Sequence, residues 1–117
     1  MAIEHVLAVV AVSDIDRSEQ WYTALFGRPA DNNPMPSLVE WQILPGAWVQ
    51  VFTDAERAGR SLLNFAVADL ESHRAEIASR GIQTEAIIDA NKGVRTCAMT
   101  DPDGNTINLI GGFRVNY

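Results

Sequence analysis

The 117-residue chain has a single cysteine, Cys97, few basic residues and no long hydrophobic run. A lone cysteine cannot form an internal disulfide, and its sequence surroundings do not favour a nucleophilic role. No segment approaches the roughly 20 apolar residues that a membrane-spanning helix needs. The first residues lack a basic segment followed by an apolar one, which is the signature of an export signal. We therefore expect a cytoplasmic protein with no membrane partner.

Positive charge is scarce. Nine Lys and Arg residues against 15 Asp and Glu residues give a net charge of -6 at pH 7. Nucleic-acid binding needs a clustered basic face, so we expect no nucleic-acid partner. The sequence also lacks a Ser-His-Asp order, a glycine-rich phosphate loop and a Cys-x-x-Cys pair. Nucleotide-binding and zinc-finger functions are therefore not predicted.

What the sequence does contain is one pattern that occurs twice. An apolar strand leads to a helix-capping residue in each copy, Asp14 or Ser13 in the first and Asp69 in the second, and the predicted helices end before Gly27 and at Gly81. Short strands follow each helix. Such a repeat is one supersecondary unit that needs its partner to close a core. The pattern predicts a single α+β domain, residues 1–117, of two βαβββ modules, about 1–53 and about 60–113.

Turn residues define the shorter elements. Pro45-Gly46 and the segment from Asp101 to Asn105 predict hairpins, because proline and glycine supply the backbone angles of tight turns. Residues 32–36 contain two prolines and predict a loop. The strands that we expect are residues 3–12, 38–44, 47–52, 61–67, 82–89, 94–100 and 106–110.

Alternation along these strands separates two sheet faces. One face is apolar and should pack on the helices through Ile15, Trp21, Leu25, Leu70 and Ile77. The other face mixes aromatic and amide side chains, which suits a ligand cavity. The facing of residues 38–44 stays open, because Glu40 and Gln42 alternate with Trp41. The residues that we expect to contact a ligand at this mixed face are His5, Leu7, Trp48, Gln50, Phe52, Leu62, Asn64 and Asn108.

The repeated motifs resemble the vicinal oxygen chelate superfamily, which includes glyoxalase I, bleomycin resistance proteins, fosfomycin resistance proteins and extradiol dioxygenases. The resemblance covers essentially the whole chain, and it rests on residues 12–18, Trp21-Tyr22, Phe26-Gly27, residues 48–52 and Asp101-Pro-Asp-Gly-Asn105. It implies two half-barrel sheets around a cleft, with helices on the outer face. For the enzymes of the superfamily, it also implies one divalent metal held by His and Glu side chains.

The positions that correspond to the metal ligands of the superfamily are Leu7, Gln50, Leu62 and Asn108 in this chain. None of them is an imidazole or a carboxylate. Leucines and neutral amides cannot replace those ligands around a divalent cation. We therefore expect neither a metal nor another cofactor, in which the chain resembles the bleomycin resistance branch.

Three functions stay open. The first is a metal-free protein that sequesters or transports a hydrophobic or aromatic metabolite or antibiotic. The alternative is an enzyme of the lyase, isomerase or dioxygenase type, with a displaced metal site around His5 or with His5 or Glu40 as an acid–base catalyst. The third is an interaction module whose interior is filled by side chains.

A few residues carry weaker expectations. Arg95 could hold an acidic ligand group, although a solvated position is favoured, and His73 is expected at the surface. The resemblance implies a homodimer, because sheet edges and half-barrels need covering. Trp48, Phe113 and Tyr117 are the candidates for its interface.

Overall fold

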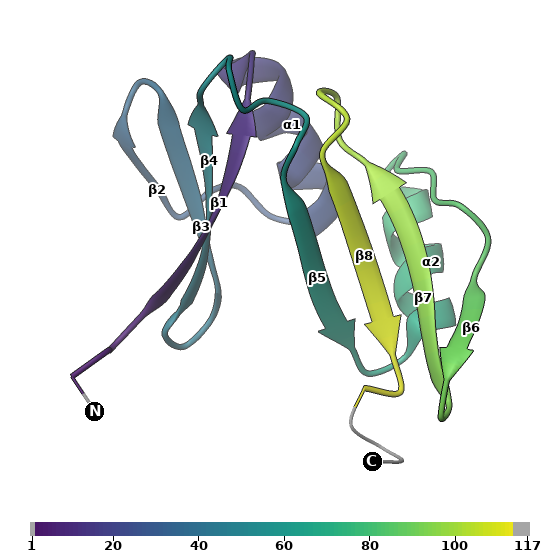
Figure 1. Ribbon diagram of the computed structural model, residues 1–117. Coiled ribbons are helices and arrows are strands. Elements are labelled where there is room, and N and C mark those ends of the chain that lie inside the picture. Colours follow the sequence, from purple (N-terminus) through teal and green to yellow (C-terminus); the bar gives the residue numbers. More distant parts are fainter. Residues whose placement is uncertain (1, 114–117) are drawn as a thin grey trace.

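The computed structural model describes residues 2–113 of the chain. It consists of two four-stranded sheets with one helix each (Figure 1). The predicted α+β class and the repeated module are confirmed. In chain order the elements are β1 (Val6–Val12), α1 (Ile15–Phe26), β2 (Asn32–Met35), β3 (Leu38–Leu44), β4 (Ala47–Thr53), β5 (Leu62–Val67), α2 (Leu70–Ser79), β6 (Ile88–Asn91), β7 (Val94–Thr100) and β8 (Thr106–Gly111).

The two sheets have the same topology. Module one, the elements from β1 to β4, has the strand order β1-β4-β3-β2, and module two, from β5 to β8, has the order β5-β8-β7-β6. The first strand of each module pairs in parallel with the last, and the last pairs in antiparallel fashion with the third. Both sheets are open. Strands β1 and β5 form neighbouring sheet edges and run in opposite directions (Figure 1).

Both helices have a predicted cap, and for α1 the structure selects Asp14 rather than Ser13. The Asp14 side chain accepts a hydrogen bond from the backbone N–H of Arg17 at 3.1 Å, and Asp69 accepts one from Ser72 at 3.0 Å. Helix α1 ends at Gly27, whose φ of 75° is left-handed and therefore favours glycine. The shared capping signal starts both helices at the same place in their modules.

Each helix covers the apolar face of its own sheet. Leu25, Leu70 and Ile77 are buried, as predicted, and Ile15 and Trp21 pack against the same core. The facing of β3 is now determined, because Trp41 is fully buried among the core residues. Its neighbours Glu40 and Gln42 therefore lie on the mixed face.

Three predicted boundaries are wrong. Residues 32–36 are not a loop throughout, because β2 forms there as an irregular edge strand, where Pro34 needs no ladder partner for its missing N–H. Residues 3–5 lie outside β1, since its partner β4 begins only at Ala47 and offers them no ladder. Residues 82–87 are not a strand, although Ile82 is buried and Glu85 donates one backbone hydrogen bond to Ala98.

The two modules are joined by contacts at one end of the strands. The Tyr22 hydroxyl of α1 donates a hydrogen bond of 2.7 Å to the buried carboxylate of Asp101, which lies in the turn before β8. Asn105 of the same turn donates to the carbonyl of Ala11 at 2.8 Å. From this junction β1 and β5 diverge toward the other end of the molecule (Figure 1).

Candidate functional site

A largely apolar groove lies between the two modules. We call it the inter-module groove, and its cavity volume is about 450 Å³. Val6 and Ala8 of β1 form one wall of the groove, and Phe65 of β5 forms another. Phe26 of α1 also lines the groove. The rings of Phe26 and Phe65 meet edge to face, with their centroids 5.8 Å apart. The groove therefore borders on an aromatic contact between residues that lie far apart in the sequence.

Three side chains with polar atoms line the groove. They are Trp48 of β4, Asn64 of β5 and His73 of α2. The Asn64 side-chain oxygen accepts a hydrogen bond from Asn108 at 3.0 Å, so its amide nitrogen can still donate to a ligand. Chemically, the groove can hold an apolar molecule and make a few hydrogen bonds to it.

His73 is the functional candidate that the sequence reasoning missed. It was expected at the surface, yet it lines the inter-module groove with its ring partly covered. The spacing of His73 in the sequence could have indicated this position. His73 lies three residues after Leu70 and four before Ile77, and positions with this spacing share one helix face. Both of those residues are buried.

The amides of the mixed face are engaged with other side chains. Gln50 donates a hydrogen bond to Glu40 at 3.1 Å, and Asn32 donates to the other oxygen of the same carboxylate at 3.4 Å. Asn108 is the donor to Asn64. Neighbouring strands thus satisfy much of this polar surface without a ligand.

The predicted ligand contacts divide among three places. Trp48 and Asn64 line the inter-module groove. Phe52 lines a second, smaller cavity beside the segment that joins the modules. The remaining predicted residues lie on the mixed face and line neither cavity, and they are His5, Leu7, Gln50, Leu62 and Asn108.

The residues at the expected metal positions do not fit a divalent cation. The side chains of Leu7 and Leu62 have no donor atoms, and the two residues are 51% and 61% exposed. Gln50 and Asn108 are hydrogen-bonded within the mixed face. Across residues 2–113, no group of three or more His, Cys, Asp and Glu side chains could hold an ion. The chemistry of these side chains is therefore not that of the superfamily's metal centre.

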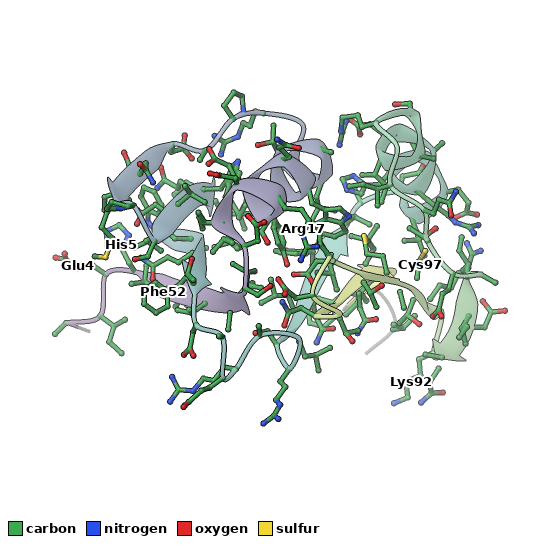
Figure 2. All side chains as sticks on the ribbon, turned by 90° about the horizontal axis from the view of Figure 1, so that it is seen from above. Glu4, His5, Arg17, Phe52, Lys92 and Cys97 are labelled. Atoms are coloured by element: carbon green, nitrogen blue, oxygen red, sulfur yellow. The ribbon has the colours of Figure 1, made fainter. Side chains whose placement is uncertain are left out.

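Neither of the two acid–base candidates lines the inter-module groove. His5 is exposed before β1, and its Nδ1 accepts a hydrogen bond of 3.1 Å from the indole of Trp48. Glu40 of β3 accepts a hydrogen bond from Gln50 of β4. Figure 2 places His5 and Phe52 at the end formed by module one, and Cys97 and Lys92 at the end formed by module two.

The remaining candidates have structural partners. Arg95 is paired with Glu71 at 2.7 Å and with Asp89 at 3.3 Å, and the hydrogen bond from Arg95 lowers the pKa of Glu71. Cys97 is buried, with its sulfur 3.4 Å from the carbonyl of Glu85. Neither side chain lines the inter-module groove.

Comparisons with known proteins define the family. Residues 7–110 match the model of the glyoxalase-like domain, so the chain belongs to this family. The match agrees with the resemblance to the vicinal oxygen chelate superfamily that the sequence motifs indicate. Among curated protein sequences, none matches the chain.

Solved structures are similar over nearly the whole chain. A glyoxalase/bleomycin resistance protein from Catenulispora acidiphila is 27% identical, with a TM-score of 0.85 over 92% of this chain and 96% of that one. An antibiotic-binding protein from a Streptomyces species is 23% identical, with a TM-score of 0.78 over 95% and 98% of the two chains. A lactoylglutathione lyase from Agrobacterium tumefaciens is 18% identical, with a TM-score of 0.73 over 92% of each. The last two likenesses show the fold alone.

Within residues 2–113, the helices are too short or too polar to cross a bilayer.

Proposed function

We propose that this member of the glyoxalase-like domain family is a metal-free binding protein for a small, mostly apolar molecule, such as an aromatic metabolite or antibiotic. The observation that carries the proposal is the inter-module groove. Its volume of about 450 Å³ lies within the range of roughly 300–1,000 Å³ that is usual for small-molecule sites. The proposal places the protein in the cytoplasm, as the sequence predicts.

The lining of the groove suggests the chemical class of the ligand. Phe26, Phe65 and Trp48 present aromatic surface, which favours a planar ring system through edge and face contacts. Each square ångström of apolar ligand surface that they bury contributes roughly 25 cal/mol. Asn64 and His73 supply the few directed polar contacts that orient a ligand in such a site. A ring with one hydrogen-bonding substituent matches this arrangement.

Two further observations support binding rather than metal-dependent chemistry. The superfamily's metal positions hold leucines and engaged amides in this chain, as described above. The similar Streptomyces structure is that of an antibiotic-binding protein, which makes antibiotic binding a function that this fold can perform.

We also propose that the protein pairs with a second copy of itself through the mixed face. Leu7 and Leu62 expose apolar surface on that face, outside the smaller cavity that Phe52 lines, and such surface favours association. Trp48 and Phe113 stay candidates for the interface, while Tyr117 lies outside the described residues. Light scattering coupled to gel filtration should give the mass of a dimer, and Leu7→Asp should shift it toward that of a monomer.

The binding proposal can be tested with the neutral fluorescent probe N-phenyl-1-naphthylamine. We expect it to bind one site per chain. Ala8→Phe should weaken binding at least tenfold, because the new ring occupies the groove. Ala78→Phe is the matched control, since Ala78 is exposed on α2 away from the groove. Equal affinity of the two variants would contradict the assignment of the groove.

The metal-free part of the proposal has its own test. Protein purified without chelators is offered nickel, zinc, manganese and iron(II), desalted and measured by plasma mass spectrometry. We expect far less than one metal per chain. About one tightly held metal that is lost in His5→Ala would instead support the displaced enzymatic site.

A further inference from the structure

We propose a second ligand site in this protein, which binds a small organic monoanion with an apolar body, such as an aromatic carboxylate. The site is a cavity of about 300 Å³ beside the segment that joins the two modules, and we call it the linker cavity. Val9, Ala11 and Phe52 form its apolar side, and Asp54, Arg57, Arg60 and Ser61 form its polar side. It shares no lining residue with the inter-module groove, so the inference does not depend on the function proposed above.

The joining segment is held in place by its backbone. Asp54 donates a hydrogen bond to the carbonyl of Val12 at 3.0 Å, and two successive turns follow, from Arg57 to Asp54 and from Arg60 to Arg57, each at 3.2 Å. Gly59 has a φ of +87°, and a Cβ atom there would lie 2.6 Å from the carbonyl oxygen of Asp103. Only glycine permits this close approach. The backbone that carries the two arginines is therefore fixed against module two.

The charges of the linker cavity do not balance. Arg57 is paired with Asp54 at 3.2 Å, but its side chain is 82% exposed. For Arg60, no side-chain hydrogen bond or ion pair is found within residues 2–113. One positive charge is thus left over, in a chain whose net charge is -6. A planar guanidinium matches the two oxygens of a carboxylate, which makes Arg60 the residue that would hold the anionic group.

Ser61 supplies a second donor next to Arg60. Its hydroxyl oxygen accepts a hydrogen bond from the backbone N–H of Ala11 at 3.2 Å, which leaves the hydroxyl proton for a ligand oxygen. The floor of the cavity is apolar, with the Phe52 ring beside Val9 and Ala11. An inorganic anion would leave this surface unused, whereas an aromatic carboxylate covers it and places its charge at Arg60.

Benzoate is the probe for this site, with neutral benzamide as its comparison. In amide proton–nitrogen correlation spectra of the whole chain, benzoate should shift the Ala11 and Ser61 signals in a saturable manner. Arg60→Gln should weaken binding about tenfold, the loss expected for one charge-assisted hydrogen bond. Lys92→Asn is the matched control. It removes the same charge at the far end of the molecule (Figure 2), and asparagine tolerates the positive φ of 51° at that position.

Three results would overturn the inference. One is equal affinity of the unmodified protein for benzoate and benzamide. Another is an equal loss in Arg60→Gln and Lys92→Asn, which would mean that only the overall charge matters. The third is a benzoate response confined to Asn64 and His73, which would place the probe in the inter-module groove. If N-phenyl-1-naphthylamine failed to bind, by contrast, the inter-module groove would be contradicted but the proposal for the linker cavity would not.

Discussion

The two modules begin with the same local structure and then build different cores. The backbone of the capping aspartate has φ -134° and ψ 107° at Asp14, and φ -133° and ψ 103° at Asp69. Eight residues later, each helix buries one side chain completely, but it is Tyr22 in module one and Ile77 in module two. The same capping residue therefore starts both helices with the same backbone geometry. The packing contacts of each module differ because the buried side chains differ.

The difference is one of aromatic content. The fourth residue of β3 is Trp41, and the fourth residue of β7 is Cys97, and both are fully buried. Trp41 packs against Phe26, whose ring also meets Phe65 of module two. Module one therefore extends its ring cluster across the junction, which is why the groove beside that junction has aromatic walls.

The largest expected effect is on this ring cluster. Trp41→Ala should lower the free energy of unfolding by about 4 kcal/mol, because it leaves a cavity and removes an indole from the core. Cys97→Ala, at the equivalent place in module two, should cost only about 1 kcal/mol. Urea unfolding followed by circular dichroism checks both values. Equal losses would show that the two cores contribute alike.

The second prediction concerns the joining segment. Gly59→Ala should cost about 3 kcal/mol, since it adds a clash with the Asp103 carbonyl to the strain of a left-handed alanine. Gly81→Ala, at the end of α2, should cost about 1 kcal/mol. Gly81 has a φ of +90°, but no atom lies within 4 Å of its added Cβ. Thermal unfolding of both variants separates the clash from the strain, and equal shifts in Tm would contradict the packing of Gly59.

Tyr22→Phe tests the polar contact between the modules. It removes the hydrogen bond to buried Asp101 and should cost about 1–2 kcal/mol at pH 7. Ile77→Val, at the corresponding place in module two, should cost about 1 kcal/mol without any change in pH dependence.

Alkaline pH distinguishes these two variants. Burial, and then the neighbouring Asp101, raise the pKa of Tyr22 well above its ordinary value of 10.0. The unfolded chain therefore releases this proton near pH 10 while the folded chain keeps it. The stability that Tyr22 contributes is fully present below pH 10 and falls above it by up to about 1.4 kcal/mol per pH unit. This slope should be reduced in Tyr22→Phe only, and its persistence there would assign it to other groups.

The smallest expected loss of stability should be the same in the two modules. Asp14→Ala and Asp69→Ala each remove one capping hydrogen bond of the same geometry, and each should cost about 1 kcal/mol. Chemical denaturation of the two single variants checks this. A clear inequality would mean that the packing of a module changes the value of its cap.

Much of this fold follows from local sequence signals. The caps at Asp14 and Asp69 and the turn at Gly104 depend on neighbouring residues only, and alternation alone assigns Val49 and Val51 to the buried face. The wrongly predicted boundaries lie where pairing with a neighbouring strand determines whether a segment is a strand. Pro34 can lie in a strand because that strand is a sheet edge, and residues 3–5 are not part of β1 because no neighbouring strand pairs with them.

The site was less predictable than the fold. Sequence alternation brought Trp48 and Asn64 together with residues of the mixed face, yet in the structure these two line a groove with Phe26 and His73 of the helices. Arg60 attracts no notice in the sequence, because its role depends on the strand ends packed beside it.

The sequence by itself determined the repeated module, its helix caps and turns, and the leucines and amides at the positions that the family resemblance assigns to metal ligands. These features depend on side-chain identity and on spacing over a few residues. Only the tertiary structure decided where the cavities lie. The walls of the inter-module groove depend on how far β1 stands from β5, and contacts between residues distant in the chain, such as Tyr22–Asp101 and Phe26–Phe65, join the two modules there.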